Sequence, residues 1–151
     1  KPWSYTVIPP EGRVKNVLPF FEGFSTTILA SPKYGASFVF YISTVEPGAK
    51  TTRTWSAEEG IETFVYFMDG EGELSVKIGG EEKVLKQGGY AYSPAGVGMD
   101  FANKSKGTMR ILFYTPRGRS GATSTTSRNA STTIWPTSSS RTFCPPTWAS
   151  T

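Results

Sequence analysis

The stretch GGYAYSPAGVGMDFAN, residues 88–103, decides the fold class of this chain. Two runs rich in apolar and aromatic residues occupy 90–94 and 99–103, and glycines lie between them. Short apolar runs bounded by turn residues are typical of β-strands. Glycine at a sharp corner avoids the clash or strain that a side chain would bring. The stretch therefore predicts two short strands joined by a tight corner.

Upstream of this stretch, Gly79-Gly80 separates the run LSVKI (74–78) from Val84-Leu85. A two-residue glycine loop supplies the positive φ angles of a tight turn, so we expect a β-hairpin here. The same alternation of apolar runs and turn residues extends over most of the chain and predicts an all-β sandwich or barrel. The expected strands are Ser25–Ala30, Ser37–Val45, Ile61–Met68, Gly72–Ile78, Glu81–Lys86, Tyr90–Pro94, Met99–Asn103 and Thr108–Tyr114.

The run Ser37–Val45 is apolar on both of its faces. Period-two counting places Phe40 and Ile42 on one face and Tyr41 and Val45 on the other. We therefore expect both faces of this strand to be covered. A related aromatic series is expected to belong to the core or to an interface before it serves as a ligand platform: Phe64, Tyr66, Phe67 and Tyr92.

Composition agrees with this class and excludes much chemistry. The 151 residues suit one domain, and 16 Gly with 11 Pro favour short strands and turns over long helices. The absence of histidine excludes Ser-His-Asp and Cys-His catalytic sites and every metal site that needs imidazole. The one cysteine, Cys144, cannot form an internal disulfide. No run approaches the ~20 apolar residues of a membrane-spanning helix.

The glycine-rich segments on either side of the hairpin resemble the two motifs of the cupin superfamily. The second motif matches at Gly88, Pro94, Gly96 and Asn103, whereas Met99 stands where a metal-binding cupin has histidine. The first motif begins at Pro47-Gly48 and ends at residues 69–72. The resemblance implies a single cupin-type (jelly-roll) β-barrel over residues 5–117.

Counting through the first motif places its usual histidine pair at Thr54 and Ser56 and its usual glutamate at Thr63. The spacing is longer than the standard pattern, and a slip of one residue would make Glu62 the carboxylate. Such a slip in a strand reverses the face on which a side chain lies. By this resemblance, the positions of the cupin metal ligands hold Thr54, Ser56, Thr63 and Met99, and the chain has no metal site of its own.

Other segments are similar to the N-terminal half of the bicupin (S)-ureidoglycine aminohydrolases, in which two cupin halves share one chain. They are TVIPPEGR (6–13), LASPKYGASF (29–38), EPG (46–48), EGIE (59–62) and GGYAYSP (88–94). The similarity implies a family that releases ammonia from ureidoglycine in ureide (allantoin) breakdown. It also implies that manganese belongs to the C-terminal half, and that this chain is the non-catalytic N-terminal half without a cofactor.

Three hypotheses of function stay open. Besides the non-catalytic half, the chain could be a metal-free module that binds a small polar metabolite, with Arg53, Glu62 and Arg110 as candidate pocket residues at the barrel mouth. It could also be an independent metal enzyme that uses Glu62 and nearby oxygens, because hard cations prefer oxygen ligands.

The segment 118–151 differs from the rest of the chain. Half of its residues are Ser or Thr, and it has three arginines and no acid. Such a segment buries too little apolar area to offset its ordering entropy, so we expect disorder. Read in another codon frame, residues 141–151 allow a string that resembles the entry to a second cupin. A frame-shifted linker is therefore one explanation, and a natural Ser/Thr linker is the other.

Expectations about partners follow from charge and from the resemblance. The net charge of +4 is not concentrated in a basic cluster, so we expect no nucleic-acid partner. We expect no membrane partner and a soluble, cytoplasmic location. Loss of a second cupin would expose the surface that it covered, and exposed apolar patches promote association. We therefore expect a homo-oligomer that forms through cupin surfaces.

Overall fold

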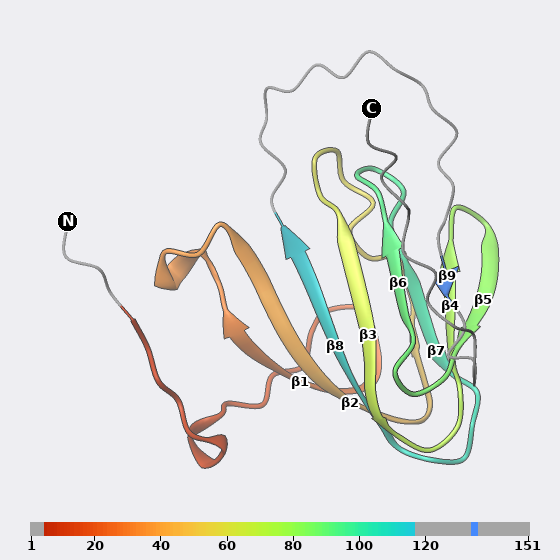
Figure 1. The fold of residues 1–151 in the computed structure, drawn as a ribbon, viewed down its shortest axis with the longest axis horizontal. Helices are drawn as coiled ribbons and strands as arrows, with labels where there is room; N and C mark the ends of the chain where they lie inside the picture. The colour runs from red at the N-terminus through yellow and green to blue at the C-terminus, as the bar shows by residue number, and fades with distance from the viewer. Residues whose placement is uncertain (1–4, 117–133, 136–151) are drawn as a thin grey trace, which may run out of the picture.

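The computed structural model describes residues 5–116 and 134–135, whose strands wrap into a nearly closed β-barrel (Figure 1). The strands are β1 (Phe21–Ala30), β2 (Phe38–Thr51), β3 (Thr63–Gly70), β4 (Leu74–Ile78), β5 (Glu81–Leu85), β6 (Tyr90–Ser93), β7 (Asp100–Asn103), β8 (Met109–Pro116) and β9 (Ile134–Trp135). Two short 3-10 turns, η1 (Pro10–Gly12) and η2 (Pro32–Tyr34), complete the described elements. The expected all-β class is confirmed.

The strand order is β5-β4-β7-β2-β8-β3-β6-β9, and β1 pairs with β2. One wall of the barrel consists of β1, the first part of β2, β8, β3 and β6, and the other wall consists of β5, β4 and β7. Strand β2 belongs to both walls. Its first part pairs with β8 as far as Val45↔Met109, and its last part pairs with β7 at Lys50↔Ala102. Between these parts Gly48 has a φ of 77°, which glycine adopts without strain. A single continuous strand thus joins the two walls.

All eight strands expected from the sequence are present, with shifted ends. The largest shift is that β2 continues through Pro47-Gly48 to Thr51, where the sequence indicated a turn. The hairpin at Gly79-Gly80 is confirmed. Ile78 pairs with Glu81, and the two glycines have φ angles of 57° and 91°.

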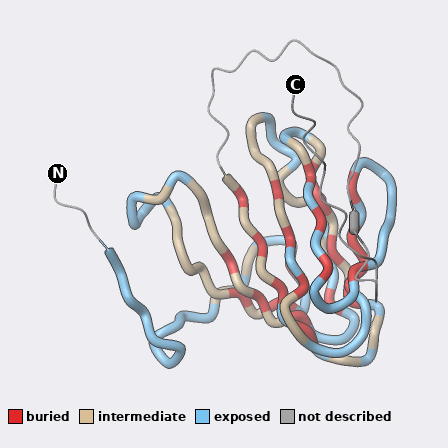
Figure 2. Tube along the Cα trace, viewed as in Figure 1, coloured by how far each residue is buried: buried red, intermediate tan, exposed pale blue. Residues whose placement is uncertain are grey.

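Burial alternates along the strands, so each strand has an inner and an outer face (Figure 2). In β2 the side chains of Tyr41, Ser43 and Val45 are buried, whereas Phe40 and Ile42 are only half-buried. The expectation that both faces of this strand are covered therefore holds for the inner face alone.

Aromatic rings fill one part of the barrel interior. Phe113 stacks on Tyr41 with ring centroids 4.5 Å apart, and on Phe21 at 5.9 Å. The ring of Trp55 meets Phe21 edge to face at 4.9 Å, and Phe101 lies 6.1 Å from Phe113. These separations lie within the range of favourable aromatic pairs. The interior is thus a packed core at this level.

The described N-terminal segment lies outside the barrel. Residues 5–17 run along its outside, where Tyr5 and Val7 are 90% and 83% exposed, and join β1 through the bridge Asn16↔Thr26. The segment expected to be disordered, 118–151, lies outside the described residues apart from β9, which pairs with β6. Among the described residues, none belongs to a helix long and apolar enough to cross a membrane.

Candidate functional site

Met99 lies inside the barrel, just before β7. Its side chain has no solvent exposure and belongs to the main hydrophobic cluster. Its backbone exchanges hydrogen bonds with Trp55, of 3.0 Å from Trp55 N to Met99 O and 2.9 Å in the other direction. A flexible thioether fills irregular gaps in a core. Met99 therefore packs as a core residue at the position where the sequence placed a lost histidine.

Thr63 opens β3 and also faces the interior. It pairs with Ser93 of β6, is 1% exposed, and its Oγ1 atom is buried without a hydrogen-bond partner among the described residues. Its neighbour Glu62 is half-buried and lies beside the phenol of Tyr92, which is partly exposed. Burial, followed by the negative charge of Glu62, raises the pKa of the Tyr92 phenol. Thr63 is thus the interior side chain of this pair.

In the loop between β2 and β3, Thr54 and Ser56 are not placed as a pair of metal-binding residues would be. Thr54 is exposed and donates a hydrogen bond of 3.3 Å to Asp100 Oδ2, and Ser56 is half-buried with a φ of 55°. The side chain between them, Trp55, enters the aromatic cluster, and its Nε1 atom is buried without a partner among the described residues.

Sequence reasoning missed Trp55 as an interior residue. The available signal was its size, because a large aromatic side chain between Thr54 and Ser56 has more to gain from burial than either neighbour. The structure therefore brings Trp55, Thr63 and Met99 into the interior and leaves Thr54 outside.

The side chain of Tyr41 is also buried in the barrel interior. Burial raises its pKa, and a hydrogen bond with the Thr115 hydroxyl acts in the opposite direction. Thr115 follows Tyr114, which pairs with Phe64 next to Thr63. The interior polar groups at this end of the barrel are therefore neutral hydroxyls and one indole N–H.

These groups do not fit a manganese ion. Among the described residues, no three His, Cys, Asp or Glu side chains are grouped so that they could hold a metal. Manganese favours carboxylate, carbonyl and water oxygens, whereas the interior positions present an indole, one hydroxyl and a thioether at Trp55, Thr63 and Met99. Among the described residues, Trp55, Thr63 and Met99 present no carboxylate or imidazole ligand for such an ion.

The three candidate pocket residues do not come together. Arg53 lies with its guanidinium carbon 5.4 Å from the ring centroid of Phe20. Arg110 binds Asp69 through two hydrogen bonds, one of them 2.7 Å from Nε to Oδ1, and holds the pKa of that carboxyl below its ordinary value. Glu62 belongs to the contact with Tyr92 described above.

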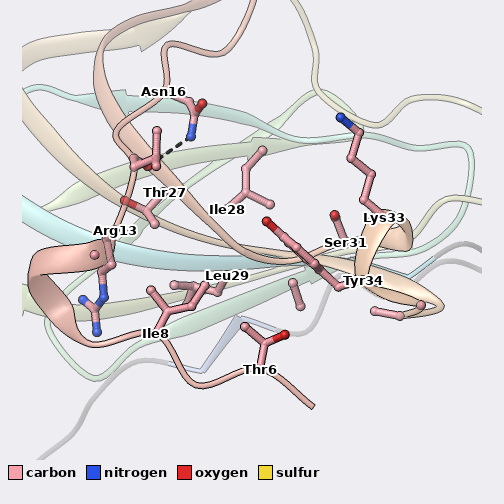
Figure 3. Close-up of a pocket in the computed structure, with 15 residues that line it drawn as sticks. Thr6, Ile8, Arg13, Asn16, Thr27, Ile28, Leu29, Ser31, Lys33 and Tyr34 are labelled. Atoms are coloured by element: carbon pink, nitrogen blue, oxygen red, sulfur yellow. Dashed lines mark hydrogen bonds between the residues drawn. The ribbon is translucent and has the colours of Figure 1, made fainter. Parts of the chain in front are cut away.

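Open hollows lie on the outside of the barrel, and two of them are lined by residues named above. The larger, of about 750 Å³, lies between the N-terminal segment and the end of β1 with η2 (Figure 3). Arg13 and Lys33 line it together with Tyr34, and a hydrogen bond from Asn16 Nδ2 to the Val14 carbonyl crosses one side. The smaller, of about 580 Å³, includes Arg53. Neither hollow includes the interior residues Trp55, Thr63 and Met99.

Comparisons with known proteins show which family this barrel resembles. Residues 41–115 match the family model described as a cupin domain. A curated relative, (S)-ureidoglycine aminohydrolase of Escherichia coli (strain K12), is 38% identical over 114 residues, which are 76% of this chain and 42% of the relative.

Solved structures agree with this match. The crystal structure of protein Ylba from E. coli has a TM-score of 0.66 at 40% identity, covering 72% of this chain and 43% of that one. A putative glyoxylate-induced protein from Pseudomonas aeruginosa shares the fold, with a TM-score of 0.61 at 24% identity over 69% of this chain and 39% of its own. The chain thus spans about two fifths of the length of these relatives.

Proposed function

Because the chain belongs to the cupin family, we propose that it serves as the non-catalytic cupin half of a ureidoglycine aminohydrolase-type protein. The observation that carries this proposal is Met99, a buried thioether at the position of a cupin metal ligand. The similarity to the E. coli aminohydrolase supports the family of reaction. The interior of this barrel is then a structural core, and catalysis belongs to the remainder of such a protein.

The side chains inside the barrel support a non-catalytic role for this chain. A divalent ion in a hydrolase polarises its substrate and activates a nucleophile, which requires ligands that this interior does not present. Among the described residues, the buried side chains include no Asp, Glu, Lys or Arg that could move a proton during a reaction. The chain's own residues therefore contribute a rigid frame: the aromatic cluster, the Gly79-Gly80 hairpin and the strand β2 that joins both walls.

Ammonia release from freshly generated (S)-ureidoglycine tests the proposal. Three proteins are compared with and without manganese: this chain, the E. coli relative, and a chimera in which residues 5–116 replace the matching part of that relative. We expect no turnover by this chain and manganese-dependent turnover by the other two. Manganese-dependent turnover by this chain alone would contradict the proposal, as would a chimera that folds but is inactive.

A second function is favoured by a separate observation, the two orphaned polar atoms inside the barrel. Trp55 Nε1 and Thr63 Oγ1 are both buried without a partner among the described residues. An unsatisfied buried polar group costs about 1–3 kcal/mol, and a bound ligand that carries an acceptor would remove this cost. The second proposal is a metal-free module that binds a small polar metabolite, such as a carboxylate or a urea derivative.

Thermal denaturation distinguishes this second function. A ligand that binds only the native state raises the melting temperature. A panel of ureidoglycolate, glyoxylate and urea is tested against the wild type and Thr63→Val, which removes the orphaned hydroxyl and keeps the shape. A rise in the wild type that is reduced in Thr63→Val supports the module, and equal rises in both argue against a site at Thr63.

A further inference from the structure

The smaller hollow on the outside of the barrel gathers positive charge. It lies over the end of β2 and over β7 and β4. Four cationic side chains and two carboxylates line it, a net charge of +2: Lys50, Arg53, Lys77 and Lys104, with Glu82 and Asp100. Residues 5–116 as a whole contain 11 Lys and Arg and 12 Asp and Glu, a net charge of −1. This cationic hollow is therefore opposite in charge to the barrel around it.

Short side chains between long ones form the floor of the cationic hollow. The register places Lys50 of β2 beside Ala102 of β7, and Ala102 beside Ser75 of β4. Lys77 follows Ser75 by two residues, so both side chains belong to the same face of β4. Ala102 and Ser75 are much shorter than the two lysines, which leaves space above them. The fold thus collects in one hollow cations that are scattered along the sequence.

One of the four cations is compensated by a carboxylate. Lys104 is paired with Glu82, which also accepts a hydrogen bond from Ser75. These hydrogen bonds, first from Lys104 and then from Ser75, lower the pKa of Glu82. Within the part of the chain that the structure describes, no carboxylate oxygen lies within 4.0 Å of a side-chain nitrogen of the other three cations. Three positive charges therefore face the hollow without a partner there.

Other lysines on the same wall are paired. Lys83 of β5 lies 4.0 Å from Glu81, and Lys86, just after β5, lies 3.4 Å from Glu73. The wall thus supplies carboxylates to lysines outside the cationic hollow. Like charges gathered around one concave site repel each other and raise the local positive potential. An anion in the hollow would offset this repulsion.

Arg53 is held in place without using its hydrogen-bond donors on a carboxylate. Its guanidinium carbon lies 5.4 Å from the ring centroid of Phe20, a cation–π contact. Phe20 has a φ of 67°, which is rare and strained for a bulky residue, and its carbonyl accepts a 2.9 Å hydrogen bond from the Thr52 N–H. Strained backbone of this kind concentrates at functional sites. The planar fork of N–H donors on Arg53 is therefore positioned for an anion.

We propose that the cationic hollow binds a small anion with two adjacent phosphate groups, such as pyrophosphate, through Lys50, Arg53 and Lys77. Phosphate oxygens are strong acceptors for arginine and lysine donors. Strands β2 and β4 are separated by β7, so their lysines start about 9.6 Å apart across the sheet and suit a diphosphate better than a single phosphate. The volume of about 580 Å³ is that of a small-molecule site.

Asp100 opposes an anion in this hollow, so its substitution tests the proposal in the opposite direction. Asp100 is the register partner of Lys77, and its Oδ2 atom accepts a hydrogen bond of 3.3 Å from Thr54 Oγ1. Asp100→Asn removes the negative charge and keeps an oxygen that can accept this hydrogen bond. We expect the variant to bind the anion more tightly than the wild type. The inference concerns the outside of the barrel and does not depend on the proposed function.

Isothermal titration calorimetry of the full 151-residue chain with inorganic pyrophosphate, in metal-free buffer of low ionic strength at pH 7.5, tests the inference. We expect submillimolar binding that weakens as sodium chloride is added, because salt screens exposed charges. Lys50→Gln and Lys77→Gln should each raise the dissociation constant at least fivefold, and Asp100→Asn should lower it at least twofold. Orthophosphate should bind at least fivefold more weakly than pyrophosphate.

Lys33→Gln is the matched control, because it removes the same charge from the larger hollow. It should leave the dissociation constant unchanged within twofold, and circular dichroism checks that each variant is folded. No binding of pyrophosphate by the wild type at 5 mM would overturn the inference. So would a loss of affinity in Lys33→Gln as large as in Lys77→Gln, or equal affinities for orthophosphate and pyrophosphate.

Discussion

Trp55 and Met99 face each other across an isolated β-bridge, with one backbone hydrogen bond in each direction. The bridge ties the loop after β2 to the residue before β7, which are two of the three places where the resemblance to cupins predicts metal ligands. Here both side chains are part of the hydrophobic interior. Met99 therefore lies in the hydrophobic core, and Trp55 packs against it.

Substitution of Met99 tests this role in packing. Met99→Ala leaves a cavity in a fully buried position and should lower the free energy of unfolding by about 2–5 kcal/mol. Met99→Leu nearly conserves volume and should cost less than about 1.5 kcal/mol. Urea denaturation measures both, and a Met99→Ala protein as stable as the wild type would contradict the packing role.

The orphaned hydroxyl of Thr63 predicts a stabilising substitution. Thr63→Val removes a buried hydroxyl that has no partner, and should raise the free energy of unfolding by about 1 kcal/mol. Thr26 is its matched control, because its buried hydroxyl is hydrogen-bonded to Ser43. Thr26→Val should be destabilising, since it leaves the Ser43 hydroxyl unpaired. If Thr63→Val is the more destabilising of the two, Thr63 Oγ1 has a partner in solution.

Alanine substitutions at two glycines with positive φ angles should lower the free energy of unfolding by very different amounts. A Cβ atom on Gly70 would lie 2.5 Å from both Met109 Cα and the Thr108 carbonyl oxygen, at a φ of 124°. On Gly96, at a φ of 82°, it would meet nothing within 4 Å. We expect Gly96→Ala to cost about 1 kcal/mol and Gly70→Ala roughly 3 kcal/mol or more. Equal costs in denaturant titration would contradict the close approach of β3 to β8.

Tyr41 predicts a loss of stability at alkaline pH. Its folded-state pKa is raised by burial, so the native state holds the phenol proton more tightly than the unfolded chain does. The contribution is complete below the ordinary tyrosine pKa of about 10 and is lost as pH rises through the raised value. Denaturation between pH 8 and pH 11 should therefore show a shallower alkaline decline for Tyr41→Phe than for wild type. Identical slopes would mean that Tyr41 titrates normally.

Local sequence chemistry was sufficient for most of the fold. The Gly79-Gly80 turn and the alternation in runs such as Ser37–Val45 depend on neighbours within a few residues, so the hairpin and the strands were predictable. The continuation of β2 past Pro47-Gly48 was not, because it depends on pairing with β7, some fifty residues further along the chain.

The site was predictable only in part. Met99 and Thr63 lie inside the barrel, and each sits in or next to a regular strand, whose period of two fixes which side chains point inward. The loop at Thr54, Trp55 and Ser56 has no strand period to fix which side chain turns inward, and the choice depends on the distant rings of Phe21 and Phe113. The pairing of Arg110 with Asp69 could not be predicted from the sequence either, because the two residues lie far apart along the chain.

Direct titration with manganese tests the central claim, that this interior is a core and no metal centre. Free hexaaquo Mn²⁺ gives a six-line electron paramagnetic resonance signal that weakens when the ion enters a protein site. With 50 μM of the chain and 50 μM Mn²⁺ at pH 7.5, the account predicts the signal of buffer alone, while a protein of known Mn²⁺ affinity serves as the positive control. A stoichiometric loss of the Mn²⁺ signal with this chain would contradict the account if the loss persists in Glu62→Gln and disappears in Thr63→Val. Such a result would mean that the ion binds inside the barrel.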